Sequence, residues 1–135
     1  MIKEMNLTAH DSQEIEGVNN VPVNQLQIIS NGYVEKMTCY CLDNLIIEDR
    51  NKVFSEAIKK VKVGGVMNLR FAALDLIQKQ IASDNLTSQK YSEVLPAMQS
   101  IWSEKDFHNV IYQIGYVLDS QYYEGINIVA TIKKK

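Results

Sequence analysis

Residues 39–71 read CYCLDNLIIEDRNKVFSEAIKKVKVGGVMNLRF, and this stretch decides the fold. Residues 37–42 are apolar and rich in strand formers, which predicts a strand, and apolar side chains recur at helical spacing over about 49–62. The pair Gly64-Gly65 is expected to end that helix, and residues 66–71 are expected to form the next strand. A strand, a helix and a second strand in this order favour a parallel sheet covered by helices.

The C-terminal part continues the pattern and ends in two strands. Its expected elements are helices over residues 74–81, 88–102 and 107–114, and strands over 116–118 and 126–132. Ser103 and Asp106 have the spacing of a capping box before the last of these helices, and Gly115 is expected to end it. The two final strands, joined by residues 121–125, are expected to pair antiparallel.

The N-terminal part is organised differently. Residues 1–7 are expected to form a first strand, residues 8–20 a polar loop and residues 21–29 a second strand. Only about a dozen residues separate the two strands, which is too few for a crossover that contains a helix. Asn31-Gly32 marks a turn, and it would close a hairpin if the flanking runs paired directly.

The composition is that of an ordinary globular protein. The chain has 135 residues, 46% of them hydrophobic and 22% charged, which predicts a single domain over residues 1–135 with a substantial core. A net charge of −2 and one short basic run, 133–135, give no nucleic-acid signature. No apolar run approaches the length of a membrane span, and residues 1–7 lack the apolar segment of a signal peptide.

The two cysteines argue for buried thiols. Cys39 and Cys41 are two residues apart in an expected strand, so their side chains would lie on the same face. That placement is poor for a disulfide, and no second cysteine or histidine pair completes a zinc site. We therefore expect free thiols, no bound metal and a reducing intracellular compartment such as the cytoplasm.

Three segments, taken in order, carry a resemblance to a known family. Residues 39–45 are a strand followed by Leu-Asp-Asn-Leu, residues 54–69 a helix, a Gly-Gly turn and a strand, and residues 115–133 a closing pair of strands. This order resembles the class I S-adenosylmethionine-dependent methyltransferases over residues 35–135, with Val63 where that family usually has proline. The resemblance implies a truncated Rossmann-like α/β fold with a mostly parallel sheet and an antiparallel C-terminal pair. It also implies S-adenosylmethionine as a cofactor.

Residues 1–34 depart from the family pattern at both places that bind its cofactor. The family's first strand leads into a glycine-rich loop, whereas the first glycine here is Gly17. The family's second strand ends in an acidic residue that accepts hydrogen bonds from the ribose hydroxyls. Residues 17–22, Gly-Val-Asn-Asn-Val-Pro, resemble that segment with Pro22 in place of the aspartate. A proline side chain cannot accept those hydrogen bonds.

Four residues are candidates for binding a cofactor at the carboxyl ends of the expected strands, where open α/β sheets bind ligands. Asp43 and Asn44 follow a central strand, and Thr8 and His10 follow the first strand. The alternative interpretation of each is a polar loop residue without a ligand. The acidic residues form no acid–base pair that the sequence reveals, so the catalytic residues stay unassigned.

Two hypotheses follow for the function. In the first, the protein is a methyltransferase-like pseudoenzyme that has lost ordinary cofactor binding and serves as a binding, assembly or accessory subunit. Because a shortened sheet would expose apolar strand faces, we expect a homo-oligomer or a protein partner. Tyr122 and Tyr123, expected in an exposed connection, are interface candidates. In the second, the protein is an active minimal methyltransferase that binds S-adenosylmethionine through an altered loop around Thr8–Ser12, with Asp43 and Asn44 nearby, and a small molecule is then a candidate partner.

Overall fold

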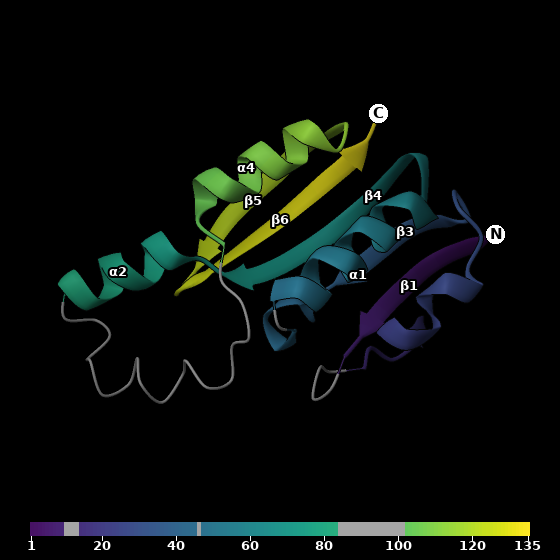
Figure 1. Ribbon diagram of the computed structural model, residues 1–135, viewed down its shortest axis with the longest axis horizontal. Helices are drawn as coiled ribbons and strands as arrows, with labels where there is room; N and C mark the ends of the chain where they lie inside the picture. Colours follow the sequence, from purple (N-terminus) through teal and green to yellow (C-terminus); the bar gives the residue numbers. More distant parts are fainter. Residues whose placement is uncertain (10–13, 46, 84–101) are drawn as a thin grey trace.

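A six-stranded mixed sheet forms the centre of the computed structural model (Figure 1). Its strands are β1 (Ile2–Thr8), β2 (Asn19–Pro22), β3 (Val34–Cys39), β4 (Val61–Ala72), β5 (Tyr116–Glu124) and β6 (Asn127–Lys134). The strand order is β2-β1-β3-β4-β6-β5. The four neighbouring strands β2, β1, β3 and β4 are parallel, whereas β6 is antiparallel to both β4 and β5. The expected mostly parallel sheet with an antiparallel C-terminal pair is therefore confirmed.

The structure describes residues 1–9, 14–45, 47–83 and 102–135. Its helices are α1 (Ile47–Lys60), α2 (Leu74–Ala82) and α4 (Glu104–Gln113), with short 3-10 helices η1 (Val23–Ile28) and η2 (Leu42–Asn44). The helix expected over residues 88–102 lies outside the described residues, apart from Trp102. The start of α4 is as expected, because the Ser103 hydroxyl accepts a hydrogen bond from the Asp106 N–H at 3.1 Å.

One face of the sheet is apolar and lies beneath α1 and α4, which Figure 1 shows on the same side of the strands. Its buried side chains come from the four strands β1, β3, β4 and β6: Met5, Leu7, Met37, Cys39, Met67, Leu69, Phe71, Ile128, Ala130 and Ile132. The ring of Phe71 lies 4.7 Å from that of Phe107 on α4, and Trp102 joins this cluster to Phe54 on α1. This single apolar layer is the core of the described structure.

The opposite face of the sheet is mainly polar, which corrects one expectation. We expected exposed apolar strand faces, but Lys36 and Arg70 are exposed there, and Thr38 and Asn68 are half-buried. The Thr131 hydroxyl donates a hydrogen bond to the Asn68 side-chain oxygen at 2.9 Å. Such an alternation is typical of a sheet that buries one face and turns the other toward water. The apolar-face argument for an oligomer therefore does not hold.

The second expected strand, over residues 21–29, is mostly wrong. Strand β2 ends at Pro22, and η1 follows at once, with Leu26 buried against the core. Proline has no N–H with which to continue a strand ladder, so the chain leaves the sheet at this point. The hairpin reading of Asn31-Gly32 is also wrong, because β2 and β3 both pair with β1, in parallel.

We expected the Gly64-Gly65 pair to end the preceding helix, but it does not. Helix α1 ends at Lys60, and both glycines lie inside β4, where pairing with β3 shifts register between Val34 and Lys36. Gly64 has a φ of 82°, and a Cβ on Gly65 would lie 2.7 Å from a backbone oxygen of β3. The pair therefore forms a bulge that requires glycine at both positions, at Gly64 because of its positive φ and at Gly65 because there is no space for a Cβ.

The last connection is shorter than predicted. Residues 121–124 belong to β5, and the turn to β6 lies at Gly125, which has a φ of 62°. Tyr122 and Tyr123 therefore sit on an edge strand and not in a loop. Gly115, with a φ of 77°, ends α4 as expected.

Candidate functional site

A cavity of about 420 Å³ lies at the carboxyl ends of β1 and β2. Thr8 and Pro22, the last residues of these two strands, are paired in register and both line it. Ala9, Val23 and Asn24 complete its described lining. The cavity thus occupies the edge at which the sequence predicted a cofactor site, and it includes one of the four predicted residues, Thr8.

The connection from β1 to β2 contains no helix in its described part, residues 9 and 14–18. The side chain of Asn20 organises it. Its amide oxygen accepts hydrogen bonds from the Ile15 N–H and from the Asn6 side chain, each at 2.9 Å, and its nitrogen donates to the Ile15 carbonyl at 2.9 Å. This partly buried amide network holds the described part of the connection, which the sequence spacing predicted to be too short for a helix.

Asp43 joins the loop after β3 to the end of β4. Its Oδ2 accepts a hydrogen bond from the Ala72 N–H at 2.8 Å. Burial raises the pKa of the Asp43 carboxyl to about 6, and the Ala72 N–H, Arg50 and Arg70 only partly offset that rise. The carboxyl group lies at the predicted edge of the sheet but does not belong to the described lining of the cavity beside Thr8.

The other two predicted site residues add less. Asn44 is the last residue of η2 and is adjacent to Asp43 in the chain. His10 lies outside the described residues. The structure therefore places Thr8 and Asp43 at the same edge of neighbouring parallel strands, and of these two only Thr8 belongs to the described lining of the cavity.

A buried arginine that the sequence reasoning missed lies next to Asp43. Arg50 on α1 is 4% exposed, and its guanidinium lies 4.4 Å from the centre of the Trp102 ring. Burial lowers the pKa of Arg50 to about 10, against the attraction of Asp43 and Asp106. Its Nε has no hydrogen-bond partner within the part of the chain that the structure describes. Its burial could have been predicted from the sequence, because Arg50 lies at helical spacing from Phe54 and Ala57 and therefore on the same face of the helix.

The cysteines match their prediction. Cys39 and Cys41 are free and buried. A side-chain hydrogen bond with Cys41 and burial hold the pKa of the Cys39 thiol well above its ordinary value. Among the described residues, no group of three or more histidine, cysteine or acidic side chains could hold a metal ion, and no helix is long and apolar enough to cross a membrane.

The predicted interface residues lie on β5 beside α4. Tyr122 is 58% exposed and Tyr123 is 55% exposed. The Tyr123 hydroxyl donates to the Glu104 carboxylate at 2.8 Å. His108 is exposed, and its Nε2 lies 2.8 Å from the Gln121 side-chain oxygen.

No protein-family model matches the sequence, and no curated protein matches it significantly. Solved structures do match. An S-adenosylmethionine-dependent methyltransferase from Thermotoga maritima superposes with a TM-score of 0.60 at 13% identity, covering 88% of this chain and 65% of that one. An O-methyltransferase family protein from Burkholderia thailandensis gives a TM-score of 0.62 at 12% identity, covering 87% of this chain and 36% of that one. The chain has the class I methyltransferase fold. This likeness concerns the fold alone, because the identities are low.

A third match has a partner protein. The complex between the Haloferax volcanii Trm112 methyltransferase activator and a protein described as a methyltransferase gives a TM-score of 0.61 at 8% identity, covering 90% of this chain and 63% of that one. The methyltransferase-like chain thus spans less than two thirds of each of these three structures.

The described lining of the cavity does not fit the ribose of S-adenosylmethionine in the usual way. At the end of β2, where this fold uses a carboxylate, the chain has Pro22. The polar side chains in the described lining are those of Thr8 and Asn24, and neither carries a charge. The described lining of the cavity therefore lacks the acidic acceptor that the family resemblance implies.

Proposed function

We propose that this protein is a catalytically degenerate methyltransferase-like subunit that acts by binding or assembling with another protein chain. The observations that carry the proposal are the short β1–β2 connection and Pro22 at the end of β2. In this fold, ligand binding depends on backbone N–H groups at a helix start and on an acceptor at the end of the second strand. The described part of this connection supplies neither of them.

The match to the Haloferax volcanii complex supports the assembly part of the proposal, since that protein of the same fold forms a complex with an activator. An accessory chain needs the sheet and its partner surface but no cofactor loop. We further propose that residues 1–135 form one domain, because a single sheet runs from Ile2 to Lys134. A cytoplasmic or other reducing compartment suits the free, buried thiols of Cys39 and Cys41.

Titration calorimetry with S-adenosylmethionine and S-adenosylhomocysteine tests the proposal. The expected result is no binding heat at millimolar ligand, with an active methyltransferase of the same fold as the positive control. Micromolar binding of either compound would refute the loss of ordinary cofactor binding. The protein's own thermal unfolding, followed in the same samples, shows that it is folded during the titration.

The second candidate function is an active, minimal S-adenosylmethionine-dependent methyltransferase. The cavity of about 420 Å³ at the carboxyl ends of β1 and β2 favours it, because ligands of open α/β sheets bind at this edge. In this case Thr8 would contact the cofactor and Asp43, with its raised pKa, would lie near a small-molecule substrate. Transfer of a labelled methyl group to any acceptor, together with micromolar cofactor binding, would establish this function over the first.

A further inference from the structure

The two edges of the sheet differ in how well they are protected from other strands. Edge strand β2 has four residues and ends in Pro22, and both features discourage further pairing. Edge strand β5 has nine residues, no proline, and only Asp119 and Glu124 as charged side chains. Within the described chain, no strand pairs with its outer side. Strand β5 is therefore the edge open to another strand.

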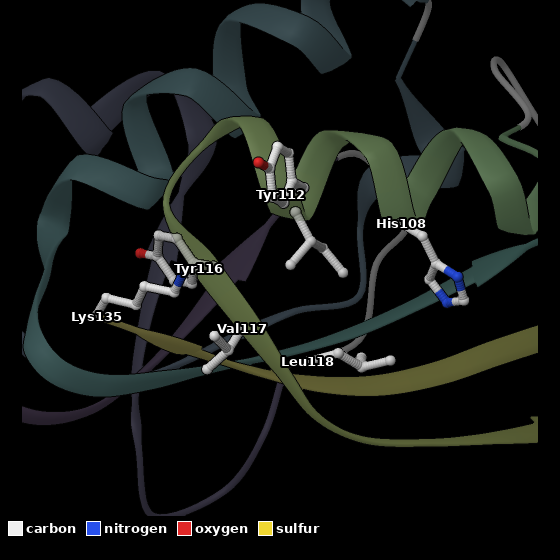
Figure 2. A pocket seen from close by; sticks show the side chains of 7 residues that line it. His108, Tyr112, Tyr116, Val117, Leu118 and Lys135 are labelled. Carbon is white, nitrogen blue, oxygen red and sulfur yellow. The ribbon is translucent and has the colours of Figure 1, made fainter.

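An apolar hollow of about 250 Å³ lies directly beside this edge. Figure 2 shows its side chains, which come from α4, from the first half of β5 and from Lys135 at the end of the chain. They include Tyr112, which is 84% exposed, and Val117 and Leu118, which are also exposed. Exposed apolar groups around a hollow are typical of a surface that contacts another molecule.

The strand register defines which exposed side chains share a face. Leu118 is paired with Ile132 and Tyr123 with Ile128, so both lie on the face that α4 covers. Tyr122, paired with Val129, lies on the opposite face. The Tyr123 hydroxyl is held by Glu104, so its half-exposed ring is presented in a fixed position. A fixed aromatic ring binds at a lower entropic cost than a free one.

We propose that the partner of β5 is a second copy of this chain, bound by antiparallel pairing of the two β5 strands about a two-fold axis at Gln121. This inference deepens the assembly role proposed above, and rests on it, by naming the partner. Pairing of β5 with β6 shifts register between Leu118 and Ser120, and we keep this shift in the pairing of the two β5 strands. Leu118 then lies opposite the partner's Tyr123 on the α4 face of the sheet. Each copy then covers the rim of the other's hollow, as a two-fold interface requires.

The charges of β5 favour this arrangement. In this register, Val117 lies opposite the partner's Glu124, and Ser120 lies opposite the partner's Tyr122. No acidic side chain lies directly opposite another, whereas an axis at Asp119 would place the two Asp119 side chains opposite each other. Like charges directly opposite one another destabilise a strand pair, and aromatic pairs with apolar residues stabilise it. A strand that complements itself in this way fits an identical partner.

Light scattering on the full chain at micromolar concentration tests the proposal, with a mass of twice 15.4 kDa as the expected result. Leu118→Lys is expected to give the single-chain mass. Val63→Lys is the matched control, because Val63 is exposed on β4, away from β5, and this variant is expected to keep the dimer. A single-chain mass for the unmodified protein, or a dimer that survives Leu118→Lys in a folded variant, overturns the proposal.

A cysteine cross-link tests the axis itself. Gln121→Cys places two thiols opposite each other at the axis, so it is expected to form an inter-chain disulfide under mild oxidation. Glu124→Cys is the control and is expected to stay uncross-linked. A cross-link at the control position alone overturns the proposed register. Cofactor calorimetry separates the two proposals: a monomer that binds no cofactor refutes only the dimer, and a dimer that binds cofactor refutes only the degenerate function.

Discussion

Replacing Asp43 by asparagine is expected to stabilise the fold at neutral pH. Burial raises the pKa of the Asp43 carboxyl from its ordinary 3.8 to about 6, although the Ala72 N–H, Arg50 and Arg70 favour the charged form. Desolvation therefore outweighs these attractions at this site. Asparagine has nearly the same shape and keeps an oxygen that can accept the hydrogen bond from Ala72. The substitution thus removes a buried charge while it retains the contact between the η2 loop and β4.

The direction and size of the effect follow from proton binding. The unfolded chain releases the Asp43 proton near pH 3.8, whereas the folded chain holds it until about pH 6. Between these two pH values the folded state binds more protons, so the free energy of unfolding falls as pH rises. A rise of about two pKa units corresponds to about 3 kcal/mol at most, and partial solvent access reduces this to about 1–3 kcal/mol.

Urea unfolding of the protein and its Asp43→Asn variant, at pH values below 3.8 and above 6, checks this prediction. The variant is expected to be more stable only at the higher pH. Asp75→Asn is the matched control, because Asp75 also accepts a hydrogen bond from a backbone N–H, that of Glu104, but is exposed. A variant at Asp43 that is less stable than the protein above pH 6 would show that the arginines stabilise the carboxylate, and would refute the reasoning.

Three further substitutions test local features, each by chemical or thermal unfolding. Gly65→Ala should destabilise the fold by about 1–3 kcal/mol, because its Cβ would lie 2.7 Å from a backbone oxygen. Gly64→Ala brings its Cβ near no other atom, so it should cost only the strain of a positive φ, about 1 kcal/mol. Equal losses of stability in the two variants would contradict this explanation. Ser103→Ala should lose about 1 kcal/mol with the cap of α4, and Ser103→Thr should lose much less. Tyr116→Phe should lose about 1 kcal/mol with the 2.7 Å hydrogen bond to the Ile58 carbonyl, and an unchanged midpoint would argue against that bond.

The centre of the sheet was predictable because its signals are local. The apolar run before Leu42 and the helical spacing of Phe54 and Ala57 each specify one element. The alternation of Ile128 and Ala130 likewise indicates a strand with one buried face, and the structure confirms it. The family resemblance was drawn from these same segments, and the shared fold supports it.

The misplaced elements share a physical cause, which is that one residue pattern can serve two conformations. A glycine with positive φ ends a helix or forms a bulge, so Gly64 could not distinguish the two. Residues 119–121 are polar and resemble a loop, but an edge strand needs little burial. Near the cavity, Thr8 could be placed from its position at the end of a strand, whereas the burial of Arg50 was not predicted because a charged residue on an apolar helix face is unusual.

Site-resolved nuclear magnetic resonance with S-adenosylmethionine tests the central claim most directly, namely that the fold of a methyltransferase persists here without its ordinary cofactor site. The amide signals of Thr8, Ala9, Val23 and Asn24 report on the described lining of the cavity. No saturable shift of these signals is expected at millimolar ligand. Saturable shifts centred on these residues, with micromolar affinity, would contradict it.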